Sequence, residues 1–155
     1  MNKGDIFPLK QKLYAACEAS LERRLSDVQT ALAEAQEAAN QETKSSAGDK
    51  HETGRAMMQL ETEKLSHQLK EILNEQQTLK MIRPEHTNQV VDKGALVITN
   101  HLNLYIAISA GRLLIDGKEF YAISINTPLG LALKEKKAGD SATFQNKTHK
   151  ILQIS

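Results

Sequence analysis

Aromatic residues are scarce in this sequence. Phe and Tyr together make up 4% of its 155 residues, and Trp is absent. A hydrophobic core must therefore be built mainly from Leu, Ile, Val and Ala. The only cysteine is Cys17, which excludes a disulfide within the chain and is typical of a protein in a reducing compartment.

Long apolar runs are also missing. The first residues, MNKGDIFPLKQKLY, contain no apolar stretch of the length found in a signal peptide, and no segment approaches the roughly 20 apolar residues of a membrane-spanning helix. The formal net charge is only +1, so no strong positive field favours general binding to nucleic acid. We therefore expect a cytoplasmic protein with no membrane partner.

The usual motifs of catalytic and metal centres are absent from the sequence. It contains no Cys-x-x-Cys pair, no glycine-rich phosphate loop and no His-Glu-x-x-His. The pair Ser66-His67 has no identifiable third member of a catalytic triad. We therefore expect that the chain is not an enzyme by itself.

The first half of the sequence has the periodicity of two long helices. Apolar residues recur at intervals of four and three, which places them on one stripe of a helix and leaves Glu, Gln and Lys in water. Such a stripe needs a partner, so we expect residues 1–80 to form an antiparallel helical hairpin. The stripe positions are Tyr14, Leu21, Leu25, Val28, Leu32, Ala35 and Ala39 in the first helix and Met58, Thr62, Leu65, Leu69, Ile72, Gln76 and Leu79 in the second.

From Pro84 onward the period changes to two and strand-forming residues dominate. We expect residues 81–92 to be a linker and residues 93–155 to form a small α+β domain with an antiparallel sheet. A short helix is expected from Thr127 to about Lys136, with Thr127 as its cap and Pro128 in its first turn. The predicted strands are Ala95–Thr99, Leu102–Ser109, Phe120–Ile125, Ala142–Gln145 and Lys150–Ile154.

An acidic turn separates the two predicted helices within KSSAGDKHETGRA, residues 44–56. Asp49 followed by Glu52 has the spacing of a helix-capping box, and both charges favour the positive end of a helix dipole. The same two carboxylates can also face one side of the first helical turn and share a hard cation such as Mg²⁺. The residues alone leave both interpretations open.

Two local motifs accompany this order of elements. The segment ISINTPLGLALKEKKAGDSATFQ, residues 123–145, contains Ile-Ser-x-x-Thr-Pro-Leu-Gly-x-Ala-Leu, a charged stretch, Gly-Asp and a predicted strand. The turn at residues 48–52 reads Gly-Asp-x-x-Glu. With the hairpin and the small second domain, these motifs resemble the bacterial transcript-cleavage factors GreA and GreB over nearly the whole chain.

This resemblance implies a function for the helical hairpin and for the small second domain. The C-terminal domain would have an FKBP-like fold and would dock on a coiled coil at the rim of the RNA polymerase secondary channel, while the hairpin enters the channel. Asp49 and Glu52, at the tip, would help to hold a second Mg²⁺ that is shared with the polymerase. Backtracked RNA would then be cleaved by the polymerase, with this chain as a monomeric accessory factor.

The resemblance also implies a docking surface. Its residues would be Asn126, Thr127, Pro128, Leu129 and Gly130, together with the helix that they begin. The alternative is that Pro128 and Gly130 only shape a turn, while Leu129, Leu131 and Leu133 are divided between core and surface.

The residues after the acidic pair depart from the family pattern. Members typically continue Asn-Ala-Glu-Tyr, whereas this chain has Thr53-Gly54-Arg55-Ala56, and Lys50 and His51 place positive charge between the carboxylates. A second function therefore stays open, in which the chain occupies the polymerase channel without stimulating cleavage. Contact with the 3′ end of nascent RNA is a further expectation, through Arg23, Arg24, Lys44, Lys50, Arg55 and Lys64. The sequence also leaves room for a prolyl isomerase or for a purely structural coiled-coil dimer.

Overall fold

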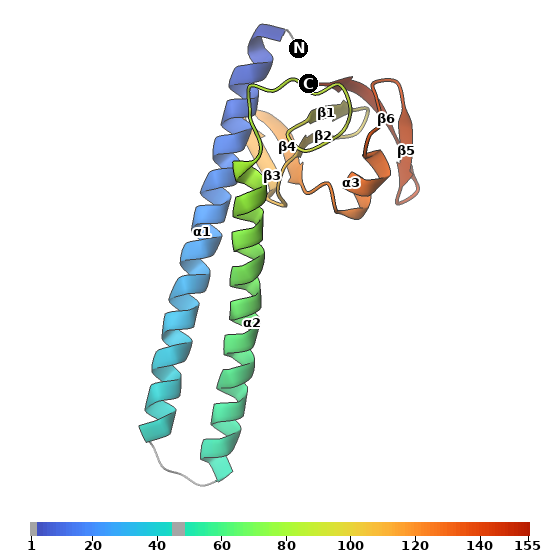
Figure 1. The fold of residues 1–155 in the computed structure, drawn as a ribbon. Coiled ribbons are helices and arrows are strands. Elements are labelled where there is room, and N and C mark those ends of the chain that lie inside the picture. Colours follow the sequence, from blue (N-terminus) through green and yellow to red (C-terminus); the bar gives the residue numbers. More distant parts are fainter. Residues whose placement is uncertain (1–2, 45–48) are drawn as a thin grey trace. The chain divides into compact units, whose positions relative to one another are not determined.

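The computed structural model describes residues 3–44 and 49–155, and side chains for residues 4–41 and 53–155. The predicted fold class is confirmed, since a helical hairpin is followed by a small sheet domain with one short helix (Figure 1). The elements are α1 (Lys3–Lys44), α2 (Asp49–Lys80), β1 (Leu96–Thr99), β2 (Asn103–Ile106), β3 (Gly111–Ile115), β4 (Lys118–Ile123), α3 (Pro128–Leu133), β5 (Ser141–Phe144) and β6 (Lys147–Ile154). None of the helices in the described ranges has an apolar stretch long enough to span a membrane.

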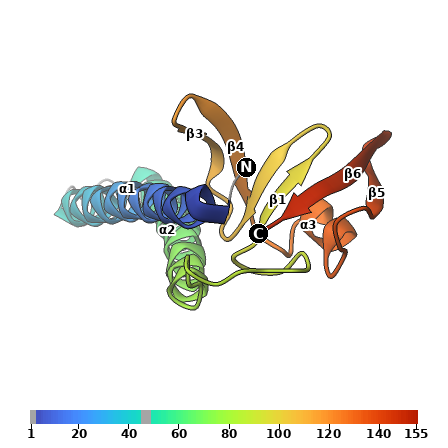
Figure 2. The ribbon, with the colours of Figure 1, turned by 90° about the horizontal axis from the view of Figure 1, so that it is seen from above.

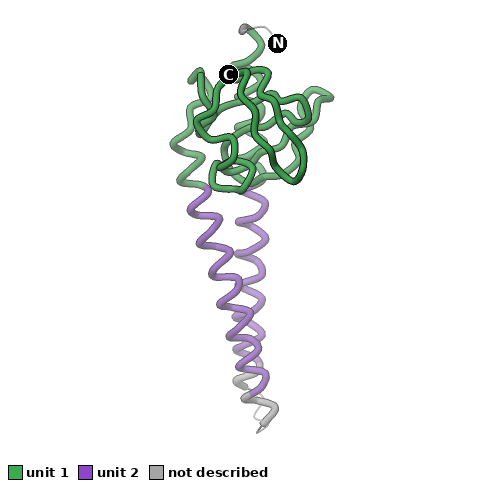
Figure 3. Tube along the Cα trace, turned by 90° about the vertical axis from the view of Figure 1, so that its right-hand side faces the viewer, with its two compact units in different colours: residues 1–20, 76–155 green, residues 21–75 purple. Residues whose placement is uncertain are grey.

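The chain divides into two compact units (Figure 3). Residues 21–75 form one unit, called the hairpin unit below. Residues 1–20 and 76–155 form the other, called the sheet unit. Each long helix therefore contributes one part to each unit, and the segment 81–92 lies within the sheet unit.

The predicted stripe is the buried face of the hairpin unit. Val28, Leu65 and Ile72 are buried, and the other stripe positions between residues 25 and 69 are half-buried. Arg24 Nη1 donates a hydrogen bond to Glu75 Oε2 at 2.7 Å, which joins the start of the α1 part of this unit to the end of its α2 part. This pairing is the one that an antiparallel hairpin requires.

The sheet has six strands in the order β3-β4-β2-β1-β6-β5. The edge strand β3 is not among the strands predicted from the sequence. The sheet is antiparallel as predicted except where β2 and β4 pair in parallel, with Tyr105 opposite Ala122. The reason is the path of the chain. After β2 it passes the position of β4 to form the edge strand β3, and the turn at Asp116-Gly117 returns it as β4, antiparallel to β3 and parallel to β2.

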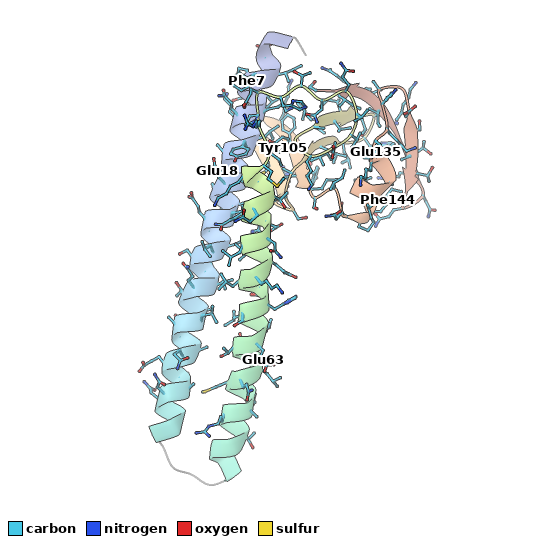
Figure 4. All side chains as sticks on the ribbon, in the orientation of Figure 1. Phe7, Glu18, Glu63, Tyr105, Glu135 and Phe144 are labelled. Carbon is cyan, nitrogen blue, oxygen red and sulfur yellow. The ribbon has the colours of Figure 1, made fainter. Side chains whose placement is uncertain are left out.

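The core of the sheet unit lies between the sheet and α3, which Figure 2 shows beside β5 and β6. Leu129 and Leu133 of α3 pack with inward-facing strand residues, and Phe144 of β5 packs against the same cluster (Figure 4). The buried members of this cluster are Val91, Ala95, Val97, Leu104, Ile106, Ile125, Leu129, Leu133 and Ile151. At about 25 cal/mol per Å² of apolar surface removed from water, such a cluster contributes strongly to the stability of the unit.

The strand residues of the opposite parity are buried as well. Leu96, Tyr105 and Phe120 are nearly inaccessible, as are Leu13 and Cys17 in the part of α1 that belongs to this unit. Burial, followed by the nearby Cys17 and Tyr14, raises the pKa of Tyr105. Tyr14 donates a hydrogen bond to the backbone oxygen of Leu79 at 3.1 Å. The sheet is therefore covered on both faces by residues of its own unit.

Candidate docking site and acidic turn

The acidic turn is described only in part. The helix α2 begins at Asp49, so Asp49 and Glu52 fall within its first turn. Their side chains lie outside the described residues, and so do residues 45–48. The metal-binding role of Asp49 and Glu52 therefore stays a prediction. Among the side chains that the structure describes, no group of three His, Cys, Asp or Glu gathers closely enough to hold a metal ion.

The segment 126–130 forms a capped turn at the start of α3. Thr127 has extended backbone angles, φ −71° and ψ 159°, and its Oγ1 accepts a hydrogen bond from the N–H of Gly130 at 3.1 Å. The same hydroxyl donates to the oxygen of Ser124 at 2.8 Å. Pro128 follows in the first turn of the helix, where its missing N–H costs nothing. The cap predicted at Thr127 is thus present, and it fixes the direction in which α3 leaves the sheet.

Gly130 is buried at the closest approach of α3 to the preceding chain. A Cβ atom at this position would lie 2.5 Å from the oxygen of Ser124 and 2.7 Å from the oxygen of Ile125. Both are backbone atoms, so no side-chain rotation relieves the clash. Leu129 is also buried, at 9% exposure, and belongs to the core cluster. These two residues can therefore support a docking surface, but they offer a partner little surface of their own.

The surface of this segment is formed by Asn126, Pro128 and Leu131, which are exposed. Leu131 is the apolar member, with 55% of its surface accessible. From the sequence, Leu131 was predicted only to be one of three leucines divided between core and surface. The spacing of the three leucines could have shown that Leu131 is exposed. Leu129 and Leu133 are one helical turn apart and are buried together, so a residue midway between them points away from the core.

The C-terminal end of α3 is fixed by the segment before β1. The N–H of Glu135 donates to the oxygen of Val91 at 2.8 Å, and the N–H of Val91 donates to the oxygen of Lys136 at 2.9 Å. Glu135, labelled in Figure 4, has φ 63°, in the left-handed region that ends a helix. Thus α3 is held at both ends, which favours a rigid surface at its exposed side.

The basic residues considered for RNA contact differ in their surroundings. Arg23, Arg55 and Lys64 are exposed, and the side chains of Lys44 and Lys50 lie outside the described residues. Arg24 is paired with Glu75 inside the hairpin unit. This pairing makes Arg24 a stabilising residue of the hairpin.

A prolyl isomerase requires aromatic side chains that a substrate can reach. Of the four aromatics in the second half, Tyr105 is 0% and Phe120 is 1% exposed. Tyr121 and Phe144 are half-buried, and Phe144 packs against the core cluster. The arrangement does not favour an aromatic-lined active site.

Comparison with known proteins gives a limited result. No family model matches the chain, and no curated protein is similar enough to count as a match. A solved structure of the transcription factor Gfh1 is similar, with 20% sequence identity over 91% of this chain and 92% of that chain. The TM-score is 0.32, so the two chains do not superpose closely, and the likeness assigns no function to this chain.

Proposed function

We propose that this chain is a Gre-type transcription factor that binds RNA polymerase and stimulates cleavage of backtracked RNA by the polymerase. The observation that carries the proposal is the position of the acidic pair. Asp49 and Glu52 lie in the first turn of α2, next to the segment 45–48 that joins two helices of 42 and 32 residues. The capped segment at Thr127 on the sheet unit provides the second motif of the same resemblance.

The chemistry of the acidic pair suits a hard cation. Carboxylate oxygens are the protein ligands that Mg²⁺ prefers, and residues three apart in a helix share one side. The positive end of the helix dipole also favours their ionised forms. Asp49 and Glu52 would hold the ion against the polymerase active site, where a second Mg²⁺ can activate water and stabilise the leaving oxygen of a phosphodiester.

The length of the helices suits delivery of the pair to a distant site. α2 has 32 residues, which corresponds to about 48 Å at ~1.5 Å per residue. The stripe residues face each other within the hairpin unit, and the remaining faces are mainly charged and polar, with Met57, Leu60 and Leu73 as single exposed apolar side chains on α2. A hairpin of this kind can enter a solvated channel without a large apolar surface.

The carboxylates can be tested directly with the double variant Asp49→Asn/Glu52→Gln. It keeps the size of both side chains and removes both charges, so stimulated cleavage is expected to fall at least tenfold. The measurement is shortening of labelled RNA in stalled, backtracked polymerase complexes. The control is Glu61→Gln/Glu63→Gln, which removes the same charge from exposed positions on α2. Equal stimulation by the parent and the Asp49/Glu52 variant would contradict the proposal.

A second candidate function is occupation of the channel without cleavage. It is favoured by the sequence of the turn, in which Lys50 and His51 place positive charge between the carboxylates and Gly54 weakens the helix by about 1 kcal/mol relative to Ala. It predicts polymerase binding and inhibition of synthesis, with no stimulated cleavage at any Mg²⁺ concentration. The same assay, with Mg²⁺ varied, distinguishes the two functions.

Docking is expected to depend on the exposed side of α3. Because Leu131 is 55% exposed, Leu131→Glu should leave the sheet unit folded and weaken polymerase binding at least tenfold by placing a charge in the interface. The matched control is Leu114→Glu on β3, where the leucine is 65% exposed. Binding is measured with immobilised polymerase. Parent-like binding by Leu131→Glu, or equal loss in both variants, would exclude this side of α3 as the docking surface.

A further inference from the structure

The segment 81–94 of the sheet unit lines a cavity of about 220 Å³ that none of the preceding functions uses. Two of its lining side chains, Arg83 and Lys93, carry positive charge, and His86 adds an imidazole. The other lining residues are Met81, Ile82, Asn88 and Gly94, so no carboxylate lines this cavity. Its chemistry is that of a small site for an anion.

The two cationic side chains are free to bind. Neither Arg83 nor Lys93 forms an ion pair with any residue that the structure describes. Asp92 is the adjacent acid in the sequence, and its Oδ1 accepts a hydrogen bond from the backbone N–H of Lys93 at 2.8 Å. Both Arg83 and Lys93 are exposed, so a ligand can reach them without displacing a protein partner.

A buried ammonium lies against the same segment. Lys10 is 1% exposed, and its Nζ donates to the oxygen of His86 at 2.7 Å, to Asn88 Oδ1 at 3.3 Å and to the oxygen of Ser155 at 3.1 Å. Burial lowers the pKa of Lys10 to about 8, so the group is still largely protonated at neutral pH. Lys10 itself lines a neighbouring cavity with Glu85 and Ser155, and its role here is to hold the backbone of His86 and the side chain of Asn88 in place.

The backbone that lines the cavity is fixed before any ligand binds. The N–H of His86 donates to the oxygen of Arg83 at 3.0 Å, and the N–H of Gly94 donates to the oxygen of Ile106 at 2.6 Å. Asn88 is 8% exposed and is held by Lys10. Because the segment is already ordered, binding costs little conformational entropy beyond that of the Arg83 and Lys93 side chains.

We propose that this cavity binds a small phosphate-containing anion, such as pyrophosphate or the phosphate groups of a free nucleotide. The guanidinium of Arg83 can donate two parallel hydrogen bonds to phosphate oxygens, Lys93 supplies a compact charge, and His86 supplies a further donor. No residue of the acidic turn or of α3 is among those that line this cavity. The site would make the sheet unit responsive to phosphate metabolites, whether or not the chain stimulates RNA cleavage.

The probe for this site is inorganic pyrophosphate, titrated into the full chain by calorimetry at low ionic strength. Saturable binding is expected, with at least tenfold weaker affinity in Arg83→Gln/Lys93→Gln. The matched control, Arg23→Gln/Lys147→Gln, removes the same charge at exposed positions outside the cavity and should bind within twofold of the parent. A thermal melt of each variant shows that the fold is retained, because all four side chains are exposed.

A free nucleotide and a single-stranded RNA oligonucleotide serve as competitors in the same titration. Displacement of pyrophosphate by a nucleoside triphosphate, together with the loss in Arg83→Gln/Lys93→Gln, would support the proposal and identify a nucleotide as a source of the phosphate. The proposal is overturned if the parent shows no saturable binding at millimolar pyrophosphate, if the double variant binds like the parent, or if the RNA oligonucleotide displaces pyrophosphate from the parent and the nucleoside triphosphate does not.

Discussion

The Gly130→Ala variant is expected to lose about 3 kcal/mol or more of its free energy of unfolding. The added Cβ would lie 2.5 Å from the oxygen of Ser124, 2.7 Å from the oxygen of Ile125 and 2.8 Å from the carbonyl carbon of Ile125. Relief requires α3 to move away from this backbone. That movement would also break the hydrogen bond from Gly130 N to Thr127 Oγ1 and withdraw Leu129 and Leu133 from the core.

Urea unfolding followed by circular dichroism measures this effect. The control is Gly4→Ala in α1, where nothing lies within 4 Å of the added Cβ. That substitution should be neutral or stabilising by up to about 1 kcal/mol, because Ala has the better helix propensity. If Gly130→Ala changes stability by less than about 1 kcal/mol, the backbone around Ser124 yields easily and α3 is not held as rigidly as its contacts indicate.

The hairpin was the most predictable part of the fold because its pattern is local. Residues such as Val28, Leu65 and Ile72 repeat at helical intervals, and burial of one stripe follows from that period alone. An antiparallel arrangement places Arg24 and Glu75 at the same end of the hairpin unit, but only the structure shows that these two residues form an ion pair. The acidic pair could be located by sequence at the start of α2, although its chemistry depends on side chains outside the described residues.

The sheet was less predictable because strand order depends on distant parts of the chain. The missed strand, Gly111–Ile115, lies at the edge and pairs only with β4, so its residues lack the regular alternation of a half-buried strand. The parallel pairing of β2 with β4 leaves no local signal, since it arises from the path through the edge of the sheet. Asp116-Gly117 is a local turn signal, with φ 51° at Asp116 and 78° at Gly117, whereas the strand before it has no comparable local signal.

The two candidate sites of the sheet unit also differ in how far they could be predicted from the sequence. Thr127-Pro128 is a local cap signal, and it gave the start of α3 correctly. Arg83 and Lys93 are ordinary surface residues in the sequence, and only the folded segment brings them to one cavity. Lys10 lies in a helix rich in charged residues, and its sequence context is that of a solvated side chain. Its three hydrogen-bond acceptors lie 76, 78 and 145 positions away in the sequence, so the sequence near Lys10 gives no sign that it is buried.

Replacing this buried lysine by alanine is expected to lower the free energy of unfolding by about 3–5 kcal/mol. The oxygen of His86 and Asn88 Oδ1 would lose their donor, and the vacated space would remain as a cavity. The oxygen of Ser155 still accepts from the N–H of Leu96 at 2.9 Å and is less affected. The matched control is Lys12→Ala. Lys12 pairs with Asp116 at 2.8 Å on the surface, so its loss should cost at most about 1 kcal/mol. Similar losses in both variants would contradict the structural role of Lys10.

The charge of Lys10 gives a second, pH-dependent test with Lys10→Met, which keeps most of the side-chain volume. The pKa of Lys10 is lowered from 10.5 to about 8 by burial, so between these values the unfolded chain binds more protons than the folded one. The free energy of unfolding of the parent therefore increases as the pH rises through this window. Relative to Lys10→Met, the parent should gain about 2 kcal/mol between pH 7 and pH 9.5. Taking the difference removes the titration of tyrosines that both proteins share. A constant difference over this range would mean that the ammonium of Lys10 is as well stabilised in the fold as in water.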